Sequence, residues 1–309
     1  MRRISVIHPK NFRQKGTHAK AIFALGMVCF FWGTTWIASK QGVKYMPALQ
    51  LAGIRQLLGG SCYLLYFLYK GATWPKGKEW GPIILLAILN FSLSNGLSTW
   101  GVKYITAGLG SIIGAIVPLW IVLIGYLRTR ELKPITTFGI VLGFGGICVV
   151  FFEHLHDFFN PQFSFGIFMS ITATLTWAIG SLYTKKQALS FNPYMSIGLQ
   201  MVISGIALSA VSGVTGATVP IWEIPWQSWV AISYLVIFGS VISFIAYLYA
   251  LQHLSAEQSS IYAYINPIIA VLFGAALFQE PLTIYIIAGG MITLLGVYLV
   301  QRGQKAINN

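Results

Sequence analysis

The chain has 309 residues, of which 56% are hydrophobic and only 9% are charged, and its formal net charge is +13. A soluble domain has about 25% charged residues, so this composition excludes a water-soluble monomer and indicates a polytopic helical membrane protein. The hydrophobic runs are continuous rather than alternating, which disfavours a transmembrane β-barrel.

The chain starts with a basic segment, residues 1–20, ahead of the first hydrophobic run. This resembles a signal peptide, but Trp32 and Lys40 follow without a small-residue cleavage pattern. We therefore expect an uncleaved first helix and a cytoplasmic N-terminal tail.

Ten hydrophobic segments follow one another, each long enough to cross a hydrocarbon core that needs about 20 residues per helix. They span residues 21–39, 48–69, 80–101, 105–127, 135–152, 165–184, 193–213, 228–250, 258–278 and 282–301. With ten spans and both termini on one side, 16 of the 20 Lys and Arg residues fall on that side and three on the other. The positive-inside rule then predicts cytoplasmic termini in a cell inner (plasma) membrane. Since topology accounts for the basic charge, we expect no nucleic-acid partner.

The two halves of the sequence resemble each other. Shifted by 149 residues, Ala107–Glu131 matches Ala256–Glu280, with the prolines, glycines and glutamates aligned. Further pairs coincide at a shift of 145, namely Trp32 with Trp177 and Lys40 with Lys185. We predict a five-helix repeat at 21–155, a second at 160–302 and a cytoplasmic tail at 303–309. Five is an odd number, so the second repeat is expected to be inverted in the membrane, as in many secondary transporters.

Pro118 and Pro267 occupy equivalent places in the two repeats. A proline inside a helix removes one backbone hydrogen bond and bends the helix. Two interpretations remain open, a structural kink alone and a kink that also serves as a hinge.

The motifs FFWGTTWIASKQGV and LAGIRQLLGG, with YITAGLGSIIGAIVPLWIVLIGYLRTRE and its second copy HLSAEQSSIYAYINPIIAVLFGAALFQE, occur in order along the chain. In these motifs the chain resembles EamA-type transporters of the drug/metabolite transporter superfamily over nearly its whole length. The resemblance implies ten helices, a central cavity, and export or exchange of small organic solutes. Arg128, Thr129 and Arg130 depart from the more apolar approach to the glutamate found in the second copy.

Arg55 lies within the second span, where a charged side chain is costly unless it faces a cavity or a partner. It is a candidate counter-charge for a substrate carboxylate or phosphate, and the alternative is an arginine that snorkels to the outer mouth. Other polar candidates are four residues apart, which places them on one helix face. They are Asn90, Ser94 and Ser98 in the third span and Ser243 and Tyr247 in the eighth; Tyr264 in the ninth span is a further polar candidate. Either they line the cavity or they hold helices together through hydrogen bonds.

Trp32, Trp36 and Trp177 lie within spans rather than at the interfaces that Trp usually prefers. They are candidates for stacking on a solute, with core packing as the alternative. The predicted substrate-binding set is therefore Trp32, Trp36, Arg55, Asn90, Ser94, Ser98, Trp177, Ser243, Tyr247 and Tyr264, with Pro118 and Pro267 as hinges.

Catalytic chemistry has little support in the sequence. The acid and histidine patch EHLHD, residues 153–157, lacks a second cluster, and Cys29, Cys62 and Cys148 follow no metal or redox spacing. We expect no enzyme activity, no metal and no cofactor. The sequence predicts a secondary transporter that moves a small organic metabolite across the membrane by alternating access, with export as the expected direction and membrane lipid as its surroundings. The alternative is a non-transporting scaffold or regulator with the same fold.

Overall fold

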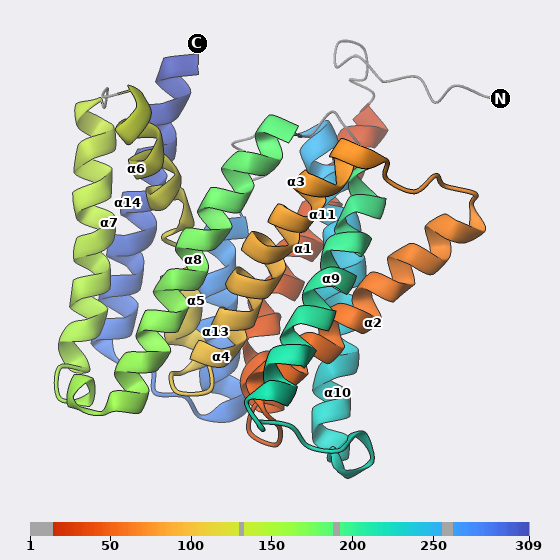
Figure 1. Cartoon of the computed structure of the whole chain (residues 1–309). Coiled ribbons are helices and arrows are strands. Elements are labelled where there is room, and N and C mark those ends of the chain that lie inside the picture. Colours follow the sequence, from red (N-terminus) through yellow and green to blue (C-terminus); the bar gives the residue numbers. More distant parts are fainter. Residues whose placement is uncertain (1–14, 130–132, 188–191, 255–261, 309) are drawn as a thin grey trace.

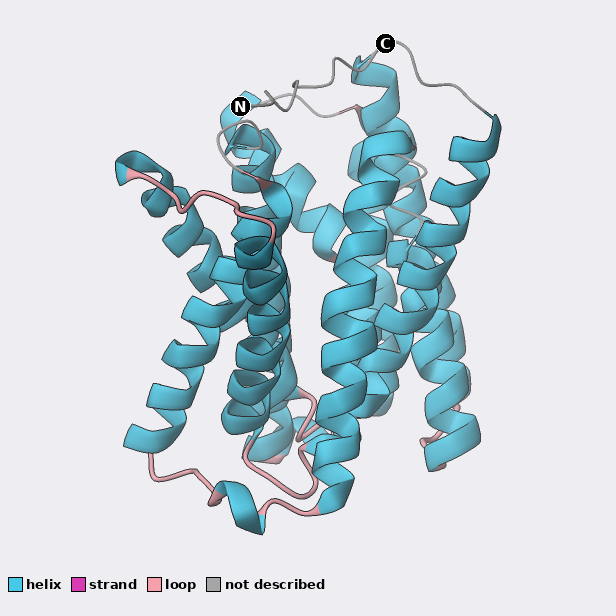
Figure 2. Cartoon of the chain, turned by 90° about the vertical axis from the view of Figure 1, so that its right-hand side faces the viewer, coloured by secondary structure: helices cyan, strands magenta, loops and turns pink. Residues whose placement is uncertain are grey.

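The computed structural model describes residues 15–129, 133–187, 192–254 and 262–308. These residues form helices joined by short loops, with no strand among them (Figure 2). The first half contains α1 (Lys15–Gly42), α2 (Ala48–Tyr69), η1 (Gly77–Glu79), α3 (Trp80–Leu86), η2 (Ala87–Asn95), α4 (Gly96–Gly101), α5 (Ala107–Gly114), α6 (Val117–Thr129) and α7 (Pro134–Glu153). The second half contains η3 (Asp157–Phe159), α8 (Pro161–Gln187), α9 (Pro193–Val214), η4 (Ile221–Glu223), α10 (Trp226–Tyr234), η5 (Leu235–Ile242), α11 (Ser243–His253), α13 (Tyr262–Phe278) and α14 (Ile284–Asn308).

The all-helical membrane architecture is confirmed. Within the described residues, nine helices are long and apolar enough to cross a membrane, and α13 is a further apolar helix of 17 residues. The first residues of the span expected at 258–278 lie outside the described part of the chain. The start of α1 and the end of α14 lie at the same end of the bundle, called here the terminal end (Figure 1).

The third span of each half is not a regular α-helix. It changes to π-helix over η2 in the first half and over η5 in the second half. The helix then continues as α4 and as α11, with helical backbone at the junctions Gly96 and Ser243. π-helical turns occur mostly as local insertions and frequently at functional sites.

Equivalent helices of the two halves pack against each other or against equivalent neighbours. α2 packs against α9, and α7 packs against α14, so each helix contacts its counterpart in the other half (Figure 1). In the same way, α1 contacts η5 and α11, while α8 contacts η2 and α4. This reciprocity is what two halves related by a twofold axis produce, whereas their inversion relative to the membrane stays a prediction.

Glycine allows the counterpart helices to approach backbone to backbone. A Cβ atom on Gly60 of α2 would lie 2.7 Å from the carbonyl oxygen of Gly198 in α9. On Gly146 of α7 it would lie 2.4 Å from the backbone nitrogen of Thr293 in α14. Small residues at helix contacts are characteristic of membrane bundles, where close packing replaces the hydrophobic effect.

Candidate functional site

A cavity of about 460 Å³ lies between the two halves. Residues from several helices form its wall: α1, α2, η2, α4, α5, α6, α8, α11 and α13, together with one residue of α14. Of the predicted binding residues, the wall includes Trp32, Trp36, Arg55, Ser94, Ser98, Trp177 and Tyr247, and it also includes the two predicted hinge prolines. The structure therefore brings these residues of both halves around one space.

Arg55 is buried, with 5% of its surface exposed, in the wall of this cavity. Its Nε donates to Ser240 Oγ at 3.2 Å and its Nη1 donates to Asn95 Oδ1 at 3.4 Å. Ser240 belongs to η5 and Asn95 ends η2. The guanidinium thus joins the π-helical segments of both halves through neutral partners, and among the described residues it forms no ion pair.

Gly239 in η5 packs against the Arg55 guanidinium. A Cβ atom at Gly239 would lie 3.1 Å from Nη2 of Arg55 and 2.6 Å from Cγ2 of Thr35 in α1. The Nε1 of Trp32, one turn earlier in α1, donates to the Gly239 carbonyl oxygen at 3.1 Å. Glycine is therefore required for this close approach, and it places the arginine and the tryptophan beside the same residue.

Four rings form a continuous cluster on the wall, which we call the aromatic wall: Trp32, Phe244, Tyr247 and Tyr262. The ring centroid of Trp32 is 5.2 Å from that of Phe244 and 5.1 Å from those of Tyr247 and Tyr262. Most of these contacts are edge-to-face, a favourable aromatic geometry. Trp36 lies apart from them, with its ring against Gly110 and Gly114 of α5.

The two prolines have different local structures. Pro118 is the second residue of α6 and follows a break after Gly114, whereas Pro267 lies inside the continuous helix α13. Neither proline has an N–H to donate to the carbonyl four residues earlier, at Gly114 and at Ala263 respectively. Both of those residues line the cavity. The hinge role of the prolines stays a prediction.

Three predicted binding residues are not in the cavity wall. Asn90 is buried against Gly180 of α8, and its Oδ1 has no hydrogen-bond partner among the described residues. Ser243 donates to the Phe238 carbonyl oxygen at 2.5 Å, and Tyr264 donates to Gln301 Oε1 at 2.5 Å. Their part in binding stays a prediction, since these contacts are those of helix packing.

The wall also contains polar residues that were not among the predicted ones: Thr35, Ser39, Asn95, Thr99, Ser111, Ser170, Thr174, Ser181, Asn266 and Gln301. Thr35 and Ser39 follow Trp32 at three and seven positions, so helical spacing from the predicted tryptophan would have identified them. Ser170 and Thr174 precede the predicted Trp177 of α8 by seven and three positions, so the same spacing would have identified them as well.

The first turn of α5 and the loop before it are each tied to another element, at the end of the bundle opposite the terminal end. Glu280 accepts from the backbone N–H of Ala107 at 2.7 Å and of Gly108 at 3.0 Å. Lys40, at the end of α1, donates to the carbonyl oxygens of Lys103 and Ile105 at 3.1 and 2.7 Å. A carboxylate on a helix N-terminus satisfies free N–H groups and matches the helix dipole. These bonds fasten the first turn of α5 to the loop after α13, and the loop before α5 to α1.

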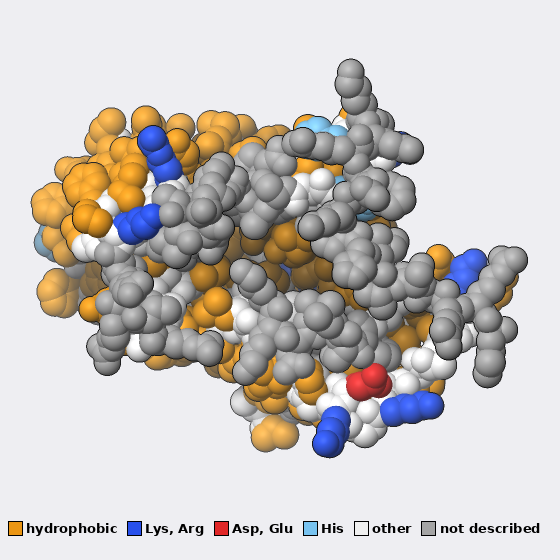
Figure 3. All heavy atoms as spheres, turned by 90° about the horizontal axis from the view of Figure 1, so that it is seen from above, with side chains coloured by type: hydrophobic (Ala, Val, Ile, Leu, Met, Phe, Trp, Pro, Cys, Tyr) orange, Lys and Arg blue, Asp and Glu red, His pale blue; other side chains and the backbone are white. Residues whose placement is uncertain are grey.

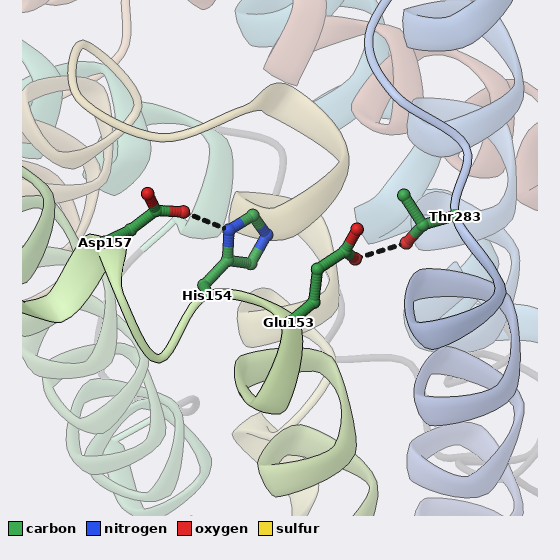
Figure 4. A network of polar contacts seen from close by, with 4 residues as sticks. All are labelled: Glu153, His154, Asp157 and Thr283. Atoms are coloured by element: carbon green, nitrogen blue, oxygen red, sulfur yellow. Dashed lines mark hydrogen bonds and ion pairs between the residues drawn. The ribbon is translucent and has the colours of Figure 1, made fainter.

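The patch at residues 153–157 divides between two partners (Figure 4). His154 Nδ1 lies 2.7 Å from an Asp157 carboxylate oxygen, while Glu153 accepts a hydrogen bond from Thr283. Among the described residues, no group of three His, Cys, Asp or Glu side chains could hold a metal ion. The Glu153 contact joins the end of α7 to the start of α14, which is a structural role.

Charges are distributed unequally between the two ends. Among residues whose side chains are described, the terminal end has six basic residues and one acid, Glu79; the basic residues are Lys20, Lys70, Lys76, Lys78, Lys133 and Arg302. Figure 3 looks onto this end and shows the described Lys and Arg side chains around its rim. The described part of the opposite end has three basic and four acidic residues: Lys40, Lys44, Lys103, Glu153, Asp157, Glu223 and Glu280.

The chain is similar in sequence to membrane transporters. YedA of Escherichia coli K12, named as an uncharacterized inner membrane transporter, is 29% identical over 296 residues, which cover 95% of this chain and 93% of YedA. YvbV of Bacillus subtilis, named as an uncharacterized transporter, is 25% identical over 284 residues, covering 91% of this chain and 92% of YvbV. These relatives support a membrane protein that transports a small solute.

A protein of known crystal structure has the same fold, with a TM-score of 0.65 over 93% of this chain and 99% of its own, at 17% identity. The model of the EamA-like transporter family matches the sequence twice, at residues 19–152 and again at residues 164–302. The two matches together cover most of the chain, including the helices that form the cavity. The chain therefore belongs to the EamA-like transporter family.

Proposed function

We propose that the chain is a secondary transporter that exports a small organic solute across the cytoplasmic membrane by alternating access. The observation that supports this most is the cavity of about 460 Å³ between the halves, with aromatic and polar side chains from both. Solute sites in transporters built from repeats lie at the repeat interface near the middle of the membrane. The outward direction is proposed from the family resemblance of the motifs.

The proposed orientation places the terminal end in the cytoplasm. This end has the excess of basic residues among the described side chains, as the positive-inside rule requires. The fastened first turn of α5 then faces the outside. In this arrangement, opening outward requires the bonds from Glu280 and Lys40 to break, while the two halves move around the cavity.

The test compares cells that produce the wild type, Ser98→Trp and Gly145→Trp. Ser98 lines the cavity, whereas Gly145 is exposed on α7 with open space around its Cβ position. We expect one or more metabolites to accumulate in the medium with the wild type and with Gly145→Trp, but not with Ser98→Trp. Each such metabolite is then tested for counterflow in vesicles that contain the purified protein. If Ser98→Trp leaves every metabolite level unchanged, the proposal that the solute passes through this cavity is wrong.

A further inference from the structure

Among the described residues, the cavity wall has a positive charge and no negative one. Among its described lining residues, Arg55 is the one Lys or Arg, and none is Asp or Glu. A guanidinium has five N–H groups, and its bonds to Ser240 and Asn95 use two of them. Burying a charge without a counter-charge is costly, so an anion that enters the cavity removes this cost and gains charge-assisted hydrogen bonds.

The aromatic wall begins beside this charge. Arg55 and Trp32 both pack on Gly239, one through Nη2 and the other through a hydrogen bond to the carbonyl oxygen. The rings of Phe244, Tyr247 and Tyr262 all pack on the Trp32 ring. A solute that reaches both features must have its charge and its apolar part only a few bonds apart.

We propose that the transported solute is a small organic anion of the carboxylate type with a planar apolar group on a short spacer. The carboxylate binds Arg55, whose planar fork suits carboxylate geometry, and the ring packs on the aromatic wall. The hydroxyl and amide groups of Ser94, Asn95 and Ser98 in the cavity wall accommodate other polar parts of the solute. This inference deepens the proposed function and rests on it.

The test measures the melting temperature of the purified full-length protein with four matched probes. They are 3-phenylpropionate, 3-phenylpropylamine, 3-phenylpropanol and propionate, which separate the anionic charge from the ring. A ligand that binds only the folded protein raises the melting temperature according to its affinity. We expect 3-phenylpropionate to stabilise the protein most, because it alone has both features.

Arg55→Gln removes the charge and should weaken 3-phenylpropionate binding by about thirtyfold or more, as is typical for a buried charge partner. Arg55→Lys retains the charge without the fork, so it should bind the acid more weakly than wild type while still preferring it to the alcohol. Lys78→Gln, which removes an exposed charge outside the cavity, should leave binding unchanged. The lysine variant keeps the test valid if Arg55→Gln does not fold.

Several results would overturn the proposal. If the amine or the alcohol stabilises the protein as much as the acid does, the solute is not selected as an anion. The same conclusion follows if the acid still stabilises the Arg55→Gln variant. If propionate and 3-phenylpropionate stabilise the protein equally, the ring does not contribute to binding. If none of the four probes stabilises the protein, the proposed solute class is wrong. Phosphatidylglycerol added to the micelles tests a lipid source of the anion. If the lipid stabilises the protein through Arg55 and abolishes the acid effect, the site belongs to a lipid headgroup.

The transport test separates the two levels of inference. If Ser98→Trp abolishes export of a metabolite while 3-phenylpropionate shows no effect through Arg55, the solute class is wrong and the proposed function stands. If Ser98→Trp changes no metabolite, the proposed function is wrong even where the acid binds.

Discussion

At Gly239, three side chains of the first half meet the backbone of the second half. The Thr35 methyl group packs where a Cβ would be, Arg55 lies beside it, and the carbonyl accepts from Trp32. A similar packing occurs between η2 and α8, where Asn90 lies against Gly180. In both places a side chain of one half fills the space that a glycine of the other leaves open.

We expect Gly239→Ala to destabilise the protein by about 1–3 kcal/mol, because the added methyl group must displace Thr35 or Arg55. The matched control is Gly26→Ala in α1, an exposed helical position with nothing within 4 Å of its Cβ site. Alanine is the better helix former, so the control should lose no stability. Thermal unfolding of both variants gives the comparison, and equal melting temperatures would show that the contact is not restrictive.

Residue patterns predicted part of this site. The sequence predicts Arg55 and the tryptophans because a charge within a span is costly unless it faces a cavity or a partner, and because Trp usually prefers the membrane interfaces. Asn90 was grouped with Ser94 and Ser98 because residues four apart share a face of an α-helix. The structure has a π-helical segment over Ala87–Asn95, so α-helical spacing does not apply there, and Asn90 packs on α8 instead.

Among elements, α7 and α14 approach each other backbone to backbone at several glycines. Cβ atoms on Gly146 and Gly289 would lie 2.6 and 2.7 Å from each other's carbonyl oxygens. The neighbouring Gly145 has open space at its Cβ position. One face of α7 is thus fixed against its counterpart, and the face one residue away is not.

These neighbours provide a matched pair of substitutions. Gly146→Val should destabilise the protein by about 3 kcal/mol or more, since the side chain meets backbone atoms that cannot rotate away. Gly145→Val has the same helix propensity at the same depth and should have a much smaller effect. Melting temperatures in one detergent decide the matter, and a similar loss in both variants would mean that helix propensity, not packing, is the cause.

The element boundaries followed closely from the sequence, because an apolar run bounded by Pro, Gly and charges has few other solutions in a membrane. The second span, predicted at 48–69, is α2 (Ala48–Tyr69). The π-helical segments η2 and η5 were not predicted, since their composition is that of an ordinary apolar helix. Their wider turns depend on packing between the halves, which no single helix encodes.

At the scale of the whole molecule, charge provides a test of orientation. With Cys29, Cys62 and Cys148 replaced by alanine, Glu79→Cys and Glu223→Cys place one thiol at the terminal end or at the opposite end. We expect a membrane-impermeant thiol reagent to label Glu223→Cys on intact cells and Glu79→Cys only after permeabilisation, because basic ends remain in the cytoplasm. Labelling in the reverse order would contradict the proposed orientation and with it the outward face of α5.

The π-helical segments also determine the phase of the helices that follow them. A π turn takes up more residues than an α turn, and each residue of an α-helix turns the following side chains by about 100°. Without the insertion, α4 would be rotated about its axis, and Ser98 and Thr99 would be turned from their present positions on the cavity wall. The same holds for Phe244 and Tyr247 after η5. The rotation of α4 and α11 about their axes therefore determines which side chains face the cavity. A π turn that moved along the helix would change this rotation while the ends of the helix stayed in place.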